Sequence, residues 1–220
     1  MNRYTLAHIA RRILRLHYDV ELSGMACMQD GKTHLVLPNH TAYIDPILLM
    51  AECGDVPLCP MTDERFFRNP FFRHILRKVD AVLVPDLEKT TQRAEGVAVA
   101  SRLSRVAIDS LAAGKEVIFY PSGHVRTVDK EVIGNRRMAY EVCQELPENV
   151  EVVLVRMRGL EYGLWSKLRP KRLCLRRKVS IHFEPMTKQL REWATTLSRR
   201  EFNQQLEAWY NRQTINENKR

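Results

Sequence analysis

Short apolar runs alternate with helical patterns along this chain, and the alternation constrains the fold more than any other feature. Each run is rich in Val, Ile, Leu and Phe, and each predicts a buried strand. These runs cover residues 34–37, 79–85, 116–121, 150–157 and 178–185. Helical periodicity covers residues 46–53, 91–113 and 188–210. Strands alternating with helices predict an α/β fold, a single domain with a mostly parallel central sheet flanked by helices.

The N-terminal segment predicts an amphipathic, basic helix. The 220 residues are 45% hydrophobic and 28% charged, which is typical of a folded domain. We divide the chain into residues 1–22, which hold this helix, and residues 23–220, the main domain with its C-terminal helix. Within 3–18 an apolar stripe carries Leu6, Ile9, Ala10, Ile13 and Leu16, while Arg11, Arg12 and Arg15 lie mostly off it. The helix either packs on the domain or lies on an anionic membrane surface, and the two are compatible.

The net charge of +9 predicts an anionic partner. Nucleic acid, anionic lipid headgroups and an acidic carrier protein all fit the charge. Zinc-finger spacing, an aromatic RNA-binding motif and a coherent basic helix are absent, so we expect no nucleic acid. The five cysteines are scattered without a C-x-x-C pair, which argues against a zinc site or disulfide framework and fits a reducing compartment. We expect a cytoplasmic protein, soluble or peripheral on a membrane, because no apolar stretch reaches the ~20 residues that span a bilayer.

The stretch LVLPNHTAYIDPILLM (35–50) places His40 and Asp45 on a predicted turn between a strand and a helix. A histidine can take a proton from a hydroxyl, and a carboxylate on its other nitrogen fixes the tautomer and stabilises the imidazolium. Without a serine, this pair suits transfer to a hydroxyl of the substrate itself. The alternative is structural: aspartate followed by proline is also a common helix start, with Asp45 as cap and Pro46 at the first helical position.

Two further segments carry candidate substrate contacts. In VIFYPSGHVR (117–126) a buried strand ends in a loop where Gly123 allows close backbone approach and Arg126 can hold a phosphate. Ser122 is a weak candidate nucleophile, because it lacks the G-x-S-x-G elbow that exposes one. In residues 63–86 phenylalanines alternate with arginines, which indicates either core packing or an apolar groove rimmed by cations.

These segments together resemble the glycerolipid acyltransferase superfamily, which contains lysophosphatidate and lysophospholipid acyltransferases. NHTAYID (39–45) matches the family's N-H-x-x-x-x-D motif, and YPSGHVRT (120–127) is similar to its F-P-E-G-T-R-S block. The second block, roughly E-x-F-x-x-P-x-F-x-x-x-L-R, is matched in order by Glu64, Phe66, Pro70, Phe72, Leu76 and Arg77. VVLVRMRG (152–159) and VSIHFEPM (179–186) are similar to the last two strands. The resemblance spans about residues 33 to 187.

The resemblance implies an O-acyltransferase in which His40, oriented by Asp45, deprotonates a hydroxyl of a lysophospholipid or lysophosphatidate. That oxygen would attack the thioester of acyl-CoA or acyl-carrier protein, with no metal or other cofactor. The matched motifs imply a set of substrate-binding residues, namely Asn39, Glu64, Arg65, Phe66, Arg77, Pro121, Ser122, Gly123, His124, Arg126 and Arg156. Ser122 replaces the family's Glu, Arg126 is displaced by one residue, and Arg156 stands where proline is expected. These departures make an acceptor with a larger headgroup plausible.

A basic run in residues 167–178, with seven Lys or Arg and no acid, suits docking to an anionic membrane or an acidic carrier protein. It also suits a solvated hairpin face. We expect the protein on the cytoplasmic face of a membrane. Other interpretations are a lipid hydrolase or thioesterase using Ser122 and a histidine, which releases fatty acid without an acceptor, and a lipid or nucleic-acid binding protein without catalysis.

Overall fold

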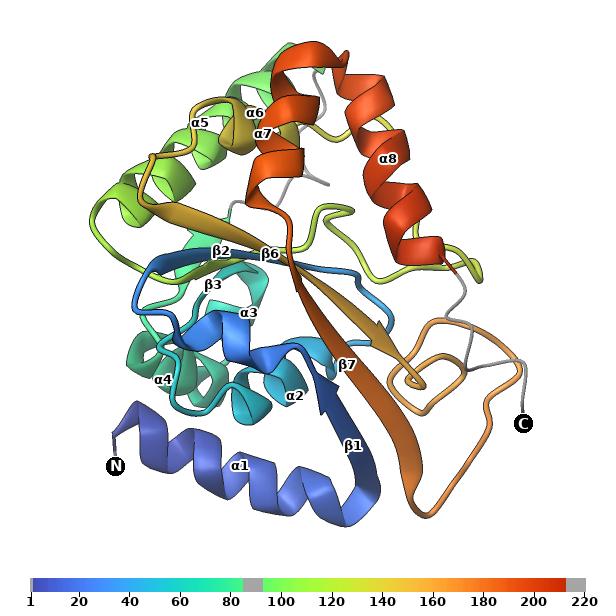
Figure 1. The fold of residues 1–220 in the computed structure, drawn as a ribbon. Coiled ribbons are helices and arrows are strands. Elements are labelled where there is room, and N and C mark those ends of the chain that lie inside the picture. The colour runs from blue at the N-terminus through green and yellow to red at the C-terminus, as the bar shows by residue number, and fades with distance from the viewer. Residues whose placement is uncertain (1, 85–92, 213–220) are drawn as a thin grey trace.

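A seven-stranded sheet organises the part of the chain that the computed structural model describes, residues 2–84 and 93–212 (Figure 1). The strand order is β1-β7-β6-β2-β5-β3-β4. The strands are β1 (Tyr18–Ser23), β2 (Thr33–Pro38), β3 (Cys59–Asp63), β4 (Val82–Val84), β5 (Val117–Ile118), β6 (Val150–Arg158) and β7 (Arg177–Pro185). The helices are α1 (Arg3–His17), 3-10 helix η1 (Met25–Gln29), α2 (Asp45–Glu52), α3 (Arg65–Arg68), α4 (Pro70–Lys78), α5 (Arg93–Ala112), α6 (Met138–Gln144), α7 (Thr187–Thr196) and α8 (Arg199–Asn211).

The sheet is mostly parallel, as the alternation of elements predicts. Strand β2 pairs in parallel with β5 on one side and with β6 on the other. Strands β5, β3 and β4 continue in the same direction. The pair β6–β7 is antiparallel, and β1 adds to β7 in parallel. The predicted α/β class is therefore confirmed, with one reversal that the sequence pattern did not reveal.

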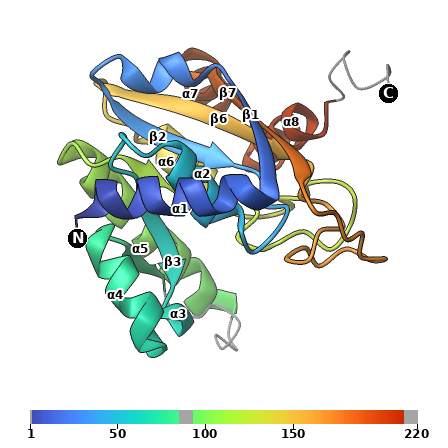
Figure 2. The same ribbon diagram turned by 90° about the horizontal axis from the view of Figure 1, so that it is seen from below.

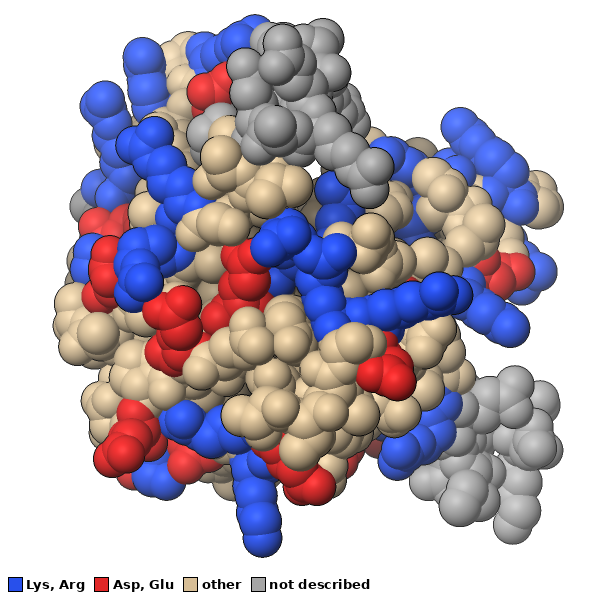
Figure 3. Space-filling view, turned by 90° about the horizontal axis from the view of Figure 1, so that it is seen from above, with Lys and Arg blue, Asp and Glu red and all other residues tan. Residues whose placement is uncertain are grey.

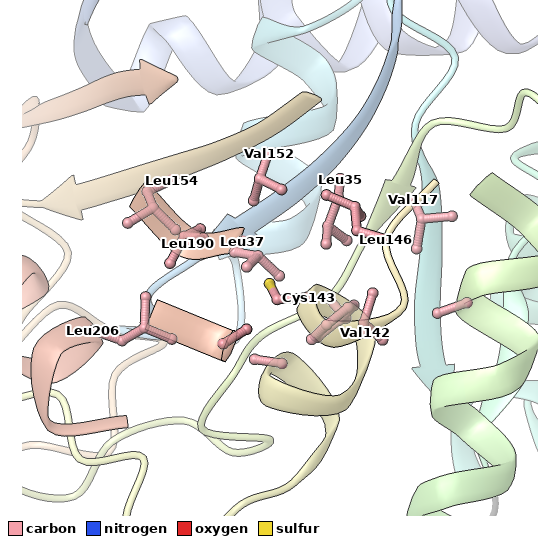
Figure 4. Packing of buried hydrophobic residues seen from close by; sticks show 14 of the residues in the cluster. Leu35, Leu37, Val117, Val142, Cys143, Leu146, Val152, Leu154, Leu190 and Leu206 are labelled. Atoms are coloured by element: carbon pink, nitrogen blue, oxygen red, sulfur yellow. The ribbon is translucent and has the colours of Figure 1, made fainter. Parts of the chain in front are cut away.

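Apolar side chains fill the space on both faces of the sheet. On β2, Leu35 and Leu37 point to the face covered by α5 to α8, whereas Val36 points to the face covered by α1 and α2 (Figures 1 and 2). Figure 4 shows the first of these clusters, in which Leu154 of β6 and Leu206 of α8 lie near Leu37. Burial on both faces explains why the central strands read as continuous apolar runs.

Several predicted boundaries differ from the structure. The single helix expected over 188–210 is wrong, because Leu197 and Ser198 interrupt it and separate α7 from α8. Ser198 and Glu201 form a reciprocal capping box there, a signal visible in the sequence as S-R-R-E. Of the run 79–85, residues 82–84 form β4, and Pro85 lies outside the described residues. Strands β1 and β3 were missed because their residues mix polar and apolar types.

The N-terminal helix packs on the domain. Glu52, at the end of α2, is fully buried and pairs with Arg11 at 3.1 Å and Arg15 at 2.8 Å. The predicted apolar stripe is divided, since Ile9, Ile13 and Leu16 are exposed. The boundary at residue 22 falls inside β1, whose residues pair with β7.

Candidate active site

The carboxyl ends of three neighbouring strands bring the candidate residues to one edge of the sheet. Strands β2, β5 and β3 are parallel and adjacent, so the loops that follow them lie at the same edge (Figure 1). His40 follows β2, Ser122 follows β5 and Glu64 follows β3. Such edges are where ligands bind in open α/β sheets.

His40 and Asp45 form a hydrogen-bonded pair at this edge. The distance between His40 Nδ1 and Asp45 Oδ2 is 3.0 Å. Asp45 is fully buried, while the His40 side chain is 13% exposed. No described residue hydrogen bonds to His40 Nε2, so that nitrogen is open to a ligand. The predicted base-and-orienter geometry is therefore present.

Asp45 does not cap helix α2. The helix begins at Asp45 itself, its N-cap is Ile44, and no side chain makes a capping hydrogen bond. The carboxylate turns back instead, and its Oδ2 accepts from the backbone N–H groups of Thr41 at 2.5 Å and Ala42 at 2.9 Å. Thr41 Oγ1 donates to Oδ1 at 3.0 Å. These donors hold the carboxylate against His40 Nδ1. The interpretation of Asp45 as the cap of α2 is therefore wrong.

The ring of His40 is held by its surroundings as well as by Asp45. Tyr120 stacks on it, with ring centroids 4.0 Å apart and planes inclined by 23°. The backbone N–H of His40 lies 3.3 Å from both carboxylate oxygens of Glu131, and its carbonyl accepts from Arg126 N at 2.9 Å. Burial raises the pKa of the Tyr120 hydroxyl well above its usual value, and the charges of Asp45 and Glu131 add to the effect. Tyr120 therefore stays neutral.

Glu131 is a buried carboxyl that sequence reasoning missed. Burial raises its pKa, opposed by a hydrogen bond from Ser122, the His40 N–H and the charge of Arg126. Asn211 of α8 exchanges two hydrogen bonds with the Glu131 backbone, at 2.8 and 2.9 Å. Glu131 thus links α8 to the His40 loop. The stretch DKEVIG, in which Asp129 and Glu131 are both acidic, gave no signal of this role.

Asn39 and Arg156 bind the scaffold. The Asn39 amide donates to Met157 O at 3.0 Å and accepts from Met157 N at 2.7 Å, which ties the end of β2 to β6. Arg156 reaches the C-terminal end of α8, where it donates to Trp209 O at 3.1 Å and lies over the Trp209 ring. Helix C-termini favour cations. The structure therefore gives both side chains structural partners, and their substrate contacts stay predictions.

The loop after β5 is a tight turn rather than a nucleophile elbow. Pro121 and Ser122 are buried, and Gly123 has φ of +69°, a conformation that favours glycine. The Ser122 hydroxyl can donate its proton to His124 O at 3.2 Å or to Glu131. His124 uses Nδ1 to donate to Ser122 O at 2.8 Å. No described hydrogen bond joins the Ser122 hydroxyl to a histidine ring, so the geometry does not favour the Ser-His pair that a serine nucleophile of this kind requires.

Two arginines compete for the role of anion contact at this loop. Arg126 is buried and paired with Glu161 at 2.7 Å, so its charge is balanced within the protein, although its Nε has no described partner. Arg136 is exposed, and its Nε lies 3.9 Å from the position that a Cβ of Gly123 would occupy. Among the described residues none pairs with the Arg136 guanidinium. Arg136 was missed by sequence reasoning because it lies outside the family motif.

The second block is divided between the two edges of the sheet. Glu64, Arg65 and Phe66 follow β3 directly and lie at the same edge as His40, and Phe66 is exposed. Arg77 lies in the last turn of α4, which returns the chain to the start of β4. Arg77 is therefore at the opposite edge of the sheet from His40, and its contact with substrate stays a prediction.

Positive charge is spread over the surface. Figure 3 shows Lys and Arg side chains projecting from much of the face over α5 to α8, with Asp and Glu between them. Net charge alone therefore does not locate an anion site. Within residues 2–84 and 93–212, no group of three or more His, Cys, Asp or Glu could hold a metal ion, and no helix is long and apolar enough to cross a membrane.

Comparison with known proteins agrees with this geometry. A family model described as Acyltransferase matches residues 19–157. The fold is similar to the crystal structure of PlsC, a 1-acyl-sn-glycerophosphate (LPA) acyltransferase from Thermotoga maritima, with a TM-score of 0.57 and 16% sequence identity. That match covers 96% of this chain and 81% of the other. A search of curated protein sequences gives no significant match.

Proposed function

We propose, from the premise that this chain belongs to the acyltransferase family whose model it matches, that it transfers a fatty acyl group to a hydroxyl of a lysophospholipid-type acceptor. The observation that carries the proposal is the His40–Asp45 pair, buried on its Asp45 side and open at His40 Nε2. A base of this kind needs a hydroxyl within hydrogen-bond reach of Nε2. The acceptor supplies that hydroxyl.

The reaction is one displacement at a thioester. His40 Nε2 takes the proton of the acceptor hydroxyl, and the oxygen forms a bond to the thioester carbonyl carbon. The tetrahedral intermediate collapses, the C–S bond breaks, and the proton passes from His40 to the leaving thiolate. Asp45 stabilises the imidazolium between these steps. General base catalysis contributes typically ~10²–10⁴-fold, with the remainder coming from positioning and stabilisation of the oxyanion.

The anionic part of the acceptor is best assigned to the loop after β5. Arg136 offers a guanidinium that no described residue pairs with, beside Gly123, where the backbone allows close approach. Guanidinium binds phosphate through two parallel hydrogen bonds. The Arg126 guanidinium is already paired with Glu161 through Nη2, although its buried Nε has no described partner. We therefore assign the phosphate of a lysolipid to Arg136, with Arg126 as the weaker candidate.

The donor is acyl-CoA or acyl-carrier protein, and the protein acts as a peripheral enzyme on the cytoplasmic face of an anionic membrane. Support comes from α1, whose outer surface carries Ile9, Ile13 and Leu16. Arg12 lies exposed among them, as an interfacial helix requires. The charges of Arg11 and Arg15 are partly balanced by Glu52, with which both form ion pairs.

The test is product identification with purified protein. Wild type is incubated with radiolabelled acyl-CoA or acyl-carrier protein and a panel of lysolipids that differ in headgroup. We expect a diacyl product that His40→Ala does not form and that His34→Gln, the matched control, does form. Release of free fatty acid without an acceptor would identify a hydrolase instead. Failure of wild type to acylate any lysolipid with either donor would overturn the proposal.

A further inference from the structure

The loop between β6 and β7 exposes apolar side chains to an unusual degree. In this β6–β7 loop, residues 159–176, Leu173 is 85% exposed and Leu175 is 96% exposed. Leu164 and Trp165 are half exposed or more. Single exposed leucines are ordinary, but a group of exposed large apolar residues marks a surface that binds something apolar.

Cations alternate with these apolar side chains. Five stand within the loop after Trp165, at Lys167, Arg169, Lys171, Arg172 and Arg176, and residues 163–176 contain no Asp or Glu. Leu173 and Leu175 thus lie between Arg172 and Arg176. An apolar tip surrounded by cations is complementary to the anionic interface of a bilayer, where leucine enters the acyl region and arginine meets headgroups.

The base of the loop is held by the protein. Arg177 donates to Gly159 O and Glu161 O, both at 3.1 Å, and closes the loop at its root. Arg172 N donates to Tyr162 O at 2.7 Å, and the Arg172 guanidinium lies over the Tyr162 ring. The two leucines that follow have no such contacts. A fixed base with exposed tips suits insertion of the tips without unfolding of the domain.

The same loop is joined to the catalytic loop. Tyr43 N donates to Trp165 O at 3.0 Å, and Ala42 pairs with Ser166 in an antiparallel bridge. Ala42 N is also a donor to the carboxylate of Asp45. Tyr43 and Ile47 are exposed and extend the apolar surface from Trp165 toward α2. The exposed apolar surface therefore begins at Tyr43, three residues from His40.

Helix α1 lies on the same side of the molecule. Arg176 and Asp19, the second residue of β1, approach to 3.4 Å, which brings the end of the loop beside the C-terminal end of α1 (Figures 1 and 2). The exposed Leu16 stands in the last turn of α1, three residues before Asp19. Helix α1 and the β6–β7 loop therefore lie on one side of the molecule. Both expose apolar and basic side chains that do not pack on the described part of the protein.

We propose that the β6–β7 loop is a membrane-insertion element that sets the mouth of the active site at the lipid interface. The proposal rests on the proposed function for its consequence, delivery of a membrane-borne lysolipid to His40. A bilayer fits better than an acidic carrier protein, because leucines exposed on all sides suit the fluid acyl region, whereas a folded partner would leave most of their surface in water.

The experiment separates membrane binding from chemistry. Leu173→Ser/Leu175→Ser is compared with wild type for binding to vesicles of equal parts phosphatidylcholine and phosphatidylglycerol, and for acyl transfer. Partial burial of two leucines corresponds to about 10- to 100-fold in partitioning, and we expect a loss of that size. Transfer to a vesicle-borne lysolipid should fall in parallel. Transfer to a short-chain lysolipid dissolved as monomers should be unchanged.

Two control variants test which features of the β6–β7 loop are needed for vesicle binding. Leu83→Ser/Val97→Ser removes two exposed apolar side chains on β4 and α5, at the opposite edge of the sheet from β7, and should bind vesicles like wild type. Arg169→Gln/Arg172→Gln should weaken binding to the anionic vesicles, by about fivefold per cation, but not to pure phosphatidylcholine.

Each other outcome has a definite meaning. Unchanged vesicle binding of Leu173→Ser/Leu175→Ser overturns the proposal. Equal loss of transfer to dissolved and vesicle-borne acceptors also overturns it, because the loop then acts within the site. Binding of wild type to acyl-carrier protein that the leucine variant loses in the absence of lipid would identify a protein partner instead. If wild type transferred no acyl group but the leucine variant still lost vesicle binding, the membrane-insertion role of the loop would stand and the proposed function would be rejected.

Discussion

Two histidines at opposite ends of β2, His34 and His40, both meet carboxylates, and their surroundings give them different chemistry. His34 Nδ1 lies 3.0 Å from Glu116 and its Nε2 lies 3.0 Å from Asp30. Its side chain is 1% exposed, against 13% for His40. At His40 the Asp45 carboxylate is hydrogen bonded to Nδ1, and no described residue hydrogen bonds to Nε2. A histidine–carboxylate pair is therefore not a catalytic signature by itself, since the base also needs a free nitrogen that faces the ligand edge.

The surroundings of His34 also favour its protonated form. Burial lowers the pKa of His34, but the hydrogen bond and charge of Glu116 and the charge of Asp30 outweigh it, and the net pKa is raised. The net raised pKa favours the cationic form of His34, and that form has no free lone pair with which to accept a proton from a hydroxyl. His34 stabilises the start of β2, whereas His40 is placed to act as a base.

The largest expected effect on transfer belongs to His40→Ala. We expect at least about 10³-fold lower kcat, because both the base and the ring that meets Asp45 are lost. Loss of the Tyr120 stack and the Asp45 hydrogen bond should cost about 1–3 kcal/mol. We therefore expect the melting temperature of His40→Ala to be several degrees lower than that of wild type. Steady-state kinetics and thermal unfolding measure the two, and activity lost only in proportion to folded protein would contradict the assignment.

Asp45→Asn should have the next largest effect and tests the charge alone. The buried N–H groups of Thr41 and Ala42 require an oxygen at the position of Oδ2, so the amide oxygen faces His40 Nδ1 and the tautomer is preserved. In Ser-His-Asp triads the equivalent change costs ~10⁴-fold, attributed to the wrong tautomer. Here we expect about 10²-fold lower kcat, from loss of the carboxylate charge beside the imidazolium. The variant should be folded by circular dichroism, and more than half of wild-type activity would reject the pair.

The sequence predicted the architecture and the contact between His40 and Asp45 because both depend on local patterns. Apolar runs buried on two faces are visible as runs, and His40 and Asp45 stand five residues apart on one turn. The division of 188–210 into two helices was missed, although S-R-R-E marks the second start. The sequence did not predict that β7 runs antiparallel to β6, because the direction of a strand depends on its partner strand and not on its own composition.

The surroundings of the pair could not be predicted in the same way. Glu131 reaches His40 from 91 positions along the chain, and Arg126 is paired by Glu161, 35 positions away. Such contacts depend on how distant loops fold over one edge, and a motif carries no information about them. Arg77 is the converse case, since its motif match is local while the direction of α4 takes it to the other edge.

A smaller effect is expected for the two arginines near Gly123, and it is confined to the Michaelis constant. Arg136→Gln should raise KM for a phosphate-bearing acceptor about tenfold, the value of one charge-assisted interaction, with KM for the thioester donor unchanged. Arg126→Gln should raise it less and lower stability, because Glu161 loses its buried partner. Lys130→Gln, an exposed cation on the same loop, is the matched control. If Arg126→Gln raised KM for the acceptor more than Arg136→Gln does, then Arg126 would be the main phosphate contact, as the family motif implies.

The smallest effect on transfer belongs to His34→Gln, which should change stability and leave kcat intact. The site is at the opposite edge of the sheet from the acceptor, so the variant and wild type should have equal activity when folded. Removal of the cation between Glu116 and Asp30 leaves two carboxylates facing an uncharged amide, which should lower the free energy of unfolding by about 1–3 kcal/mol in mild acid.

The pH dependence of that difference follows from the raised pKa of His34. A raised folded-state pKa contributes stability that is fully present below the unfolded value of about 6.5 and is lost as pH rises through the folded value. Urea unfolding from about pH 6 to pH 9 should therefore show the gap between wild type and His34→Gln narrowing as pH rises. A gap that widens would mean that His34 is held neutral, with burial prevailing over its two acids. The inference that Glu116 and Asp30 stabilise the cationic form of His34 would then fail.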